Sequence, residues 1–241
     1  MNYLELFKSI EEDIKTHPYL QLTKCKINDG ISNLENSKKE LYETLGYLKN
    51  VNLNSIFEFY KQCDGLVIKW KIASHLSDEE YSRLPKKFPG FKLPYNRESV
   101  IGSINILPFE DVFIYEQDYF ETSSSENNYI HFGNHIYKRN SFGKLLFVFD
   151  LYSDTQCMAF VPDEDNKKPK IIQLLDYYIV WDSSRITYFD SYINFLAATR
   201  GLINSKEELI DYYSTYKDQP LIFDTIPFKT EIEPSLFKDS F

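Results

Sequence analysis

The order of the hydrophobic patterns along the chain limits the possible folds more than any other feature of the sequence. Apolar residues recur every three or four positions over 2–16, 34–48 and 54–63, which predicts three leading helices. The strand-like runs lie at 66–70, 100–107, 129–137, 145–150, 157–161 and 171–175, and helical patterns return at 184–201 and 205–217. Strands grouped between helices favour an α+β fold with a mostly antiparallel sheet packed by helices, rather than the repeating units of a doubly wound fold.

The stretches between these patterns are expected to be loops. Residues 18–33 follow His17-Pro18, where proline disfavours helix in the preceding residue, and they carry no clear period. Residues 74–99 hold four prolines or glycines among charges, which predicts a long surface loop with one helical turn near 78–81. The polar stretch from Pro162 to Pro169 is typical of a hairpin loop between two strands.

The composition fits a globular chain with a substantial core. Of the 241 residues 43% are hydrophobic and 17% aromatic, which excludes intrinsic disorder. No run reaches the roughly 18 apolar residues that a membrane span needs, and the acidic start of the chain lacks the features of a secretory signal. Cys25, Cys63 and Cys157 are odd in number and far apart, which favours reduced thiols and a cytoplasmic location.

The negative charge is concentrated in the middle of the chain. Residues 98–126 carry seven acids, and residues 145–166 carry five, with no Lys or Arg in either segment. The two segments contribute −12 to a net charge of −9, so the rest of the chain sums to +3. Binding of nucleic acid needs clustered cations, so this distribution argues against a nucleic-acid ligand and favours a basic protein partner.

Two patterns suggest metal sites, but their surroundings favour structural roles. His131 and His135 are four apart, a spacing that on a helix could share a metal, yet Gly133-Asn134 and β-like flanks predict a strand or turn. The acidic run at 163–165 resembles the start of a calcium loop, but Lys168 stands where that loop needs Gly. No metal ligand is expected, and a metal-assisted hydrolase using the two histidines and nearby acids is the least favoured alternative.

The other candidates for catalysis also have simpler explanations. The scattered glycines form no phosphate-binding motif, so no cofactor is expected. Cys63 lies on the inner face of a predicted helix, where a small thiol is usually a core residue. Glu110 and Asp111 follow Pro108, and adjacent acids suit the first turn of a helix better than an acid–base pair. The sequence therefore predicts no catalytic residue and no enzymatic activity.

Four segments, in this order, resemble the SUKH superfamily of Smi/Knr-like domains, which includes many bacterial immunity proteins. The signature-like segment is Gly102–Val112, with the sequence GSINILPFEDV. Before it, residues 56–65 look like the helix and Asp-Gly turn of the family. After it, Phe147–Asp150 resembles the central strand ending in Asp, and residues 179–197 resemble the closing strand, serine and amphipathic helix.

The resemblance implies an α+β domain over residues 38–200 that binds another protein and has no catalytic residues of its own. Residues 1–33 would then be an N-terminal helical extension, and residues 201–241 a C-terminal helix and tail packed on the same domain. Immunity proteins of this family bind and neutralise a toxin domain, here expected to be basic and of the nuclease type. A regulatory scaffold for a cell-wall or signalling enzyme is the alternative.

The acidic middle of the chain is the predicted partner-binding face. Acids there would steer a basic toxin, and nearby aromatic residues would act as anchors. The candidates are Glu110, Asp111, Tyr115, Glu116, Asp118, Tyr119, Phe120, Asp154 and Glu164.

Overall fold

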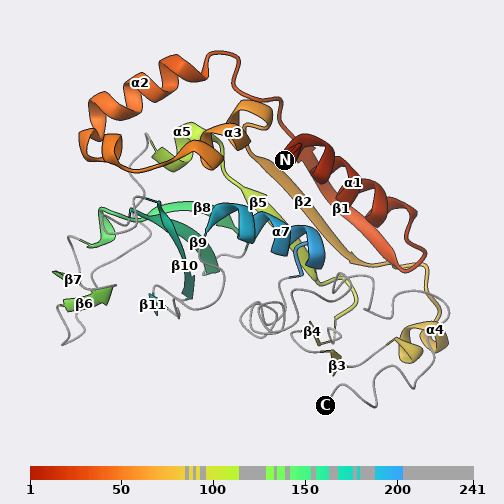
Figure 1. Ribbon diagram of the computed structural model, residues 1–241. Helices are drawn as coiled ribbons and strands as arrows, with labels where there is room; N and C mark the ends of the chain where they lie inside the picture. Colours follow the sequence, from red (N-terminus) through yellow and green to blue (C-terminus); the bar gives the residue numbers. More distant parts are fainter. Residues whose placement is uncertain are drawn as a thin grey trace. The chain divides into compact units, whose positions relative to one another are not determined.

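A computed structural model describes most of the chain up to residue 202 (Figure 1). The described residues are 1–84, 87–88, 91–92, 96–113, 129–132, 135–138, 142–152, 156–162, 168–175, 178–179 and 188–202.

The architecture is α+β, as the order of the patterns predicts. The helices are α1 (Tyr3–Thr16), α2 (Leu34–Thr44), the short 3-10 helix η1 (Gly46–Asn50), α3 (Asn54–Gln62), α4 (Asp78–Arg83), α5 (Phe109–Phe113) and α7 (Phe189–Thr199). One sheet contains β1 (Leu20–Ile27), β2 (Leu66–Ile72), β5 (Gly102–Ile106), β8 (Phe147–Leu151), β9 (Gln156–Val161), β10 (Lys170–Leu175) and β11 (Tyr178–Ile179), paired in that order. The pairs from β5 to β11 are antiparallel.

Two further hairpins complete the described strands. They are β3–β4 (Lys87–Phe88 and Phe91–Lys92) and β6–β7 (Tyr129–Phe132 and His135–Lys138), both antiparallel. The single strand-like run at 129–137 is thus two antiparallel strands, 129–132 and 135–138. The predicted hairpin between β9 and β10 is confirmed, while the predicted helix at 205–217 lies outside the described residues.

The helix at 2–16 is confirmed, but the loop predicted after it is wrong. Tyr3, Phe7, Ile10 and Ile14 are all at most 3% exposed, as their spacing requires. Residues 20–27, predicted to be loop, form β1, which pairs with β2 at the edge of the sheet; the Ala73 amide just after β2 donates to the Tyr19 carbonyl just before β1. Polar and apolar residues roughly alternate in LQLTKCKI, and this was the available signal for an edge strand.

One predicted helix boundary also differs from the structure. The second helix ends at Thr44, and the separate 3-10 helix η1 follows it, whereas the pattern predicted one helix up to residue 48. The third helix begins at Asn54 as predicted, and the side chain of Asn52 accepts a hydrogen bond from the Asn54 amide at 3.1 Å. The helical turn expected near residue 78 is confirmed as α4, which Ser77 and Glu80 cap reciprocally.

The chain divides into two compact units. The first consists of Met1–Leu4, Ile27–Leu66 and Asn105–Tyr192, and the second of Glu5–Lys26, Val67–Ile104 and the described residues from Ile193 onward. The boundary passes through β5, between Ile104 and Asn105. The domain limits inferred from the family resemblance, 38–200 with an extension on each side, remain a prediction.

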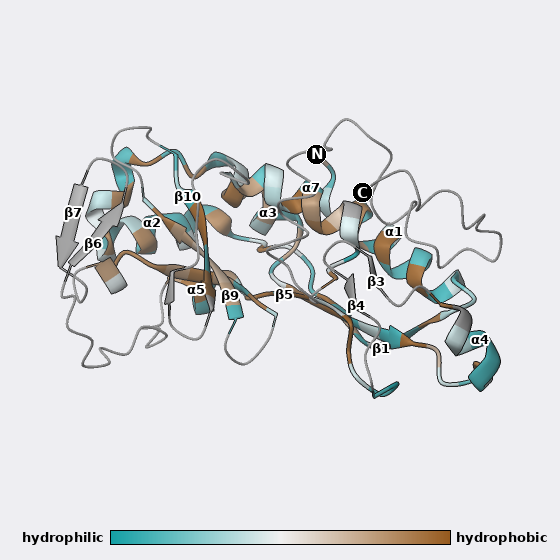
Figure 2. Cartoon of the chain, turned by 90° about the horizontal axis from the view of Figure 1, so that it is seen from below, coloured by the Kyte–Doolittle hydropathy of each residue, from teal (hydrophilic) through white to brown (hydrophobic). Residues whose placement is uncertain are grey.

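Stacked and edge-on aromatic rings fill the core of the first unit. Phe149 stacks on Phe160 with ring centroids 4.1 Å apart, and Tyr192 of α7 meets Phe149 edge-on at 5.5 Å. Each such pair stabilises a core by about 0.5–1.5 kcal/mol beyond the burial of its area. The strands β9 and β10 are hydrophobic along most of their length, as Figure 2 shows, because their residues are almost all buried.

One carboxylate, that of Asp150, lies fully buried beside this aromatic core. Its Oδ1 accepts a hydrogen bond from the Asn105 amide of β5 at 3.0 Å, and its Oδ2 accepts one from the Tyr192 hydroxyl of α7. The Asn105 side chain in turn donates to the Leu151 carbonyl at 2.7 Å. Asp150 therefore joins β5, β8 and α7 within the first unit.

In the second unit, Trp70 links β2 to the end of α7. Its indole N–H donates to the Arg200 carbonyl at 2.7 Å, and its ring fills the space in which a Cβ at Gly102 would lie. Arg200 and Gly201 both have positive φ, so they turn the chain sharply out of α7. The Asp13 carboxylate bonds the Arg200 guanidinium and holds it in this conformation.

No helix in the described part of the chain is long and apolar enough to cross a membrane.

The contact between Tyr192 and Asp150 predicts a difference between two matched substitutions. Tyr192 and Tyr60 are both fully buried in the first unit, but the Tyr60 hydroxyl donates to the neutral Leu107 carbonyl at 3.0 Å. Hydrogen bonds to charged groups contribute about 1.5–3 kcal/mol, against about 0.5–1.5 kcal/mol for neutral pairs. We expect Tyr192→Phe to lower the free energy of unfolding in urea by roughly 1 kcal/mol more than Tyr60→Phe. Equal losses would contradict a charged acceptor at Asp150.

Candidate functional site

The described part of the predicted acidic face is the short helix α5. Glu110 and Asp111 are its second and third residues, and both are exposed. The expectation that these two acids follow Pro108 in the first turn of a helix is confirmed. Tyr115, Glu116, Asp118, Tyr119, Phe120, Asp154 and Glu164 lie outside the described residues.

The rest of α5 is anchored in the aromatic core, so its two acids project from a fixed support. Phe109, Val112 and Phe113 are at most 5% exposed. The ring of Phe109 lies edge-on to that of Tyr60 of α3, with centroids 5.3 Å apart, and Phe113 reaches Phe147 at 5.3 Å. Rigid presentation reduces the entropy that a side chain loses on binding.

A second carboxylate, Asp64, fixes the start of α5. Its Oδ1 accepts a hydrogen bond from the Phe109 amide at 2.9 Å, which satisfies one of the unpaired donors of the first helical turn. Burial, and after it the nearby Asp64 carboxylate, raises the pKa of the Tyr60 hydroxyl well above its usual value. Tyr60 is therefore neutral and donates to the Leu107 carbonyl in the segment leading into α5.

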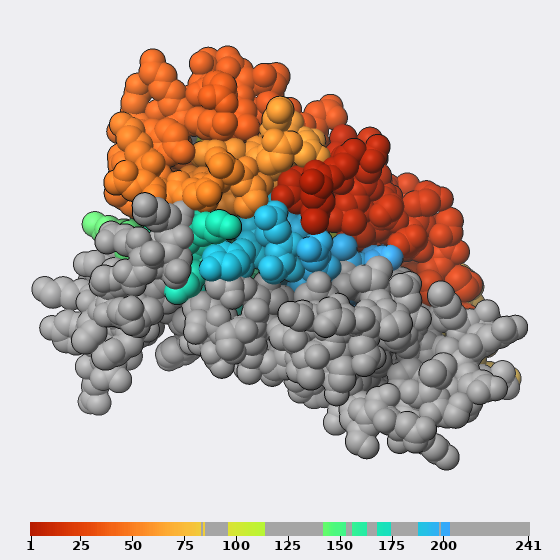
Figure 3. All heavy atoms as spheres, in the orientation of Figure 1, coloured from red at the N-terminus to blue at the C-terminus, as the bar shows by residue number. Residues whose placement is uncertain are grey.

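The helices α2, α3 and α5 form a connected surface, which we call the α2–α3–α5 surface (residues 34–44, 54–62 and 109–113). Phe57 of α3 connects all three helices, because its ring contacts Tyr42 of α2 and Phe109 of α5, each with centroids 6.2 Å apart. Figure 1 shows these helices beside one another, and in Figure 3 the residues of α2 and α3 lie together on one face.

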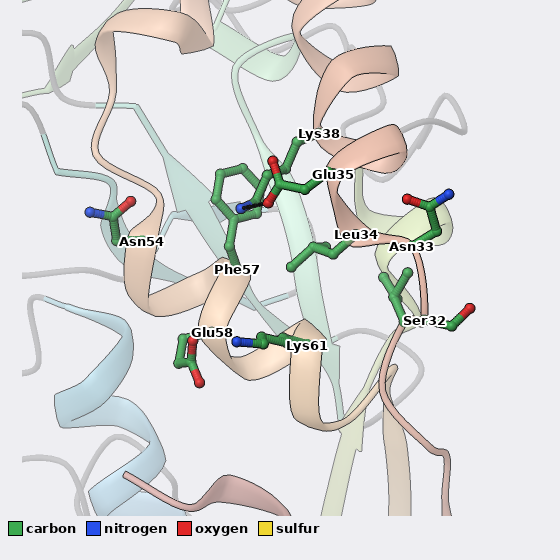
Figure 4. Close-up of a pocket in the computed structure, with 10 residues that line it drawn as sticks. Ser32, Asn33, Leu34, Glu35, Lys38, Asn54, Phe57, Glu58 and Lys61 are labelled. Atoms are coloured by element: carbon green, nitrogen blue, oxygen red, sulfur yellow. Dashed lines mark hydrogen bonds and ion pairs between the residues drawn. The ribbon is translucent and has the colours of Figure 1, made fainter.

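A pocket of about 390 Å³ opens between α2 and α3 on this surface (Figure 4). The residues that line it include two carboxylates, two ammonium groups and one aromatic ring, namely Glu35, Glu58, Lys38, Lys61 and Phe57. Sequence reasoning missed this site. The spacing of Glu35 and Lys38 on α2 was the one local signal, but the contribution of α3 depends on tertiary packing.

The structure corrects the argument from concentrated acidity. Asp150, counted among the twelve acids of the two segments, is 0% exposed and binds Asn105 and Tyr192. Glu98 is ion-paired with Lys71 and also accepts a hydrogen bond from Ser74. Of the four described acids in these segments, Glu110 and Asp111 are the ones on the α2–α3–α5 surface. The −12 of the two segments therefore overstates the charge available to steer a partner.

The two histidines lie on paired strands, which agrees with the strand or turn that their β-like flanks predict. His131 is in β6 and His135 begins β7, where it pairs with Phe132. Among the residues that the structure describes, no three His, Cys, Asp or Glu side chains gather closely enough to hold a metal. The acidic run at 163–165 lies outside the described residues.

None of the three cysteines forms a disulfide, and two are buried. Cys63 is 0% exposed on the core side of the α3 end, and Cys157 is 5% exposed. Burial raises the pKa of Cys63 to about 12. Burial, followed by a hydrogen bond to Glu11 of α1, raises the pKa of the half-buried Cys25 to about 11. These shifts oppose formation of the thiolate that a nucleophile requires.

Comparisons with known proteins add no family assignment. The chain matches no protein-family model, no curated protein and no solved structure.

The thiol environments predict slow chemical modification. The ordinary thiol pKa is 9.0, so a pKa of about 11 lowers the thiolate fraction of Cys25 near pH 8 about a hundredfold. We expect the folded protein to react with a thiol-specific disulfide reagent about a hundredfold more slowly than the unfolded chain. Glu11→Gln should speed modification of Cys25 at least about threefold, because it weakens the acceptor that favours the protonated thiol.

The adjacent, exposed Glu12 provides the matched control. Glu12→Gln should leave the modification rate of Cys25, followed by mass spectrometry, unchanged. Equal rates for the parent, Glu11→Gln and Glu12→Gln would show that Glu11 does not control this thiol.

Proposed function

We propose that the protein is a non-enzymatic binding module of the immunity type, which binds a basic toxin domain through the α2–α3–α5 surface. The observation that carries this proposal is the exposed pair Glu110 and Asp111 on a helix whose other side is locked into the core. Fixed exposed acids attract a basic partner before contact and can meet its cations without first becoming ordered.

The resemblance to the SUKH superfamily supports the same surface. Its signature-like segment, residues 102–112, comprises β5, the turn at Leu107-Pro108 and most of α5. The segment resembling the central strand is most of β8, and its terminal Asp150 binds the main chain of β5. Two of the family-like segments are therefore in contact just before the chain enters the acidic helix α5.

A cytoplasmic location fits the proposed role. None of the three cysteines forms a disulfide, and two of them are buried in the core as thiols. Free thiols persist in a reducing compartment, where an immunity protein would meet a toxin made by its own cell or delivered into it.

The proposal predicts a kinetic effect of charge reversal. Surface-based binding kinetics would be measured, at low and at high salt, against basic nuclease-type toxin domains, beginning with any that is encoded beside this chain's gene. We expect the double variant Glu110→Lys, Asp111→Lys to slow association roughly tenfold at low salt while changing dissociation less. High salt should slow association of the parent protein and reduce the difference between the two proteins.

The control makes the same charge change elsewhere. Glu5 and Glu12 are exposed residues of α1 in the second unit, so Glu5→Lys, Glu12→Lys alters net charge equally. If this control slows association as much as the α5 variant, net charge and not this surface governs binding. Association that responds neither to salt nor to the α5 variant would refute the proposed binding face.

A further inference from the structure

The pocket between α2 and α3 already holds a cation, and this cation belongs to the chain itself. The Lys38 ammonium lies 2.6 Å from a Glu35 carboxylate oxygen and 4.9 Å from the centroid of the Phe57 ring. Figure 4 shows the Phe57 side chain reaching from α3 toward Lys38 and Glu35 on α2. A carboxylate and an aromatic face together are the two kinds of group that proteins use to recognise ammonium and guanidinium groups.

The Phe57 ring is held by its neighbours, and the cation upon it is bound by one ion pair to an exposed carboxylate. Phe57 is 5% exposed and its ring is held by Tyr42 and Phe109, so the aromatic face cannot move away easily. Lys38 and Glu35 are three residues apart on α2, and their side chains are 25% and 81% exposed. Such surface pairs on a helix are weak, so the lysine can leave the ring at small cost.

A second carboxylate lies across the pocket. Glu58 is exposed on α3, and its Oε1 accepts a hydrogen bond from the neutral Gln62 amide at 2.9 Å. Lys61 also lines the pocket and is exposed, so its flexible side chain can extend into solvent. The pocket thus offers a guanidinium group two carboxylates and one aromatic ring.

We infer that this pocket is a subsite for an arginine side chain of the partner, and that Lys38 is an internal occupant which the arginine displaces. Arginine fits better than lysine, because a planar guanidinium can stack on Phe57 while bonding a carboxylate with two N–H groups. The inference deepens the proposed function and rests on it for the basic character of the partner. The pocket adjoins α5 through the contact between Phe57 and Phe109, so one basic surface could meet both.

The direct test uses a single amino acid as the probe, without any toxin. Arginine methylamide would be titrated into isotope-labelled protein, and the amide resonances of Glu35, Phe57 and Glu58 followed by NMR. Citrulline methylamide, which has nearly the same shape and the same α-ammonium group but no guanidinium charge, is the matched ligand. For one side chain we expect a Kd on the order of millimolar for arginine, with the citrulline probe at least about tenfold weaker.

Removing the internal cation should strengthen the binding. Lys38→Met keeps an apolar stem over the ring and deletes the ammonium, so the Kd for arginine methylamide should fall about fivefold. Glu35→Gln introduced beside it should reverse the gain. Lys39→Met is the control, because Lys39 lies next to Lys38 on α2 but is 76% exposed and paired with Glu43 at 3.8 Å. It should leave the Kd as in the parent protein.

Three results would overturn the inference. The first is that the citrulline probe binds as tightly as the arginine probe. The second is a Kd for the arginine probe that is no lower in Lys38→Met than in Lys39→Met. The third is that N-acetylglutamate methylamide binds more tightly than the arginine probe, which would make Lys61 the recognition group. Lys38→Ala repeats the test if Lys38→Met fails to fold. The probe is not a toxin, so arginine binding could be observed even if the proposed toxin interaction were wrong. Conversely, the kinetics of the α5 variants could support the toxin interaction even if the pocket did not bind arginine.

Discussion

The first unit depends on a single buried carboxylate, that of Asp150. A buried charge is tolerated only when its oxygens are fully engaged, and those of Asp150 bind the Asn105 amide and the Tyr192 hydroxyl. These partners come from β5 and α7, which are distant from β8 in the sequence. The carboxylate therefore fixes the register at which β5 meets β8, with Ile106 opposite Asp150, and it holds the first turn of α7 against the strands. The position of β5 in turn determines where α5 begins, because only Leu107 and Pro108 separate the two elements.

A second constraint places α3 beside α5. Gly65 has a φ of +79°, and its Cα lies so close to the main chain of Ile106, Leu107 and Pro108 that a side chain has no room. This close approach brings the preceding Asp64 to the Phe109 amide and the hydroxyl of Tyr60 to the Leu107 carbonyl. The exposed acids of α5 and the pocket beneath α2 thus share one support. Both features belong to a surface whose geometry is set by buried polar contacts and aromatic rings.

The sequence predicts the elements with a strong period, and it fails where tertiary contacts decide. Hydrophobic spacing and local turn chemistry predict the helix α1, the strands β2, β5, β8, β9 and β10, and the end of α7 at Gly201. The strand β1 was missed because Pro18 and the many polar residues after it are equally typical of a loop. Asp150 was counted as surface charge, because nothing next to it in the sequence indicates that Asn105 and Tyr192 enclose it. The pocket was missed for the same reason, since Glu35 and Phe57 are brought together only by the packing of α2 on α3.

The central claim is that a basic partner binds the α2–α3–α5 surface, and hydrogen exchange of the complex tests it most directly. The amides would be compared by mass spectrometry with and without the toxin domain that the binding kinetics identify as the partner. The account predicts slower exchange in residues 34–62 and 105–113 of the first unit, and no change in residues 5–26 and 67–104 of the second. The opposite result would contradict this claim: in a saturated complex, exchange would be slower only in residues 5–26 and 67–104 and unchanged in residues 34–62 and 105–113.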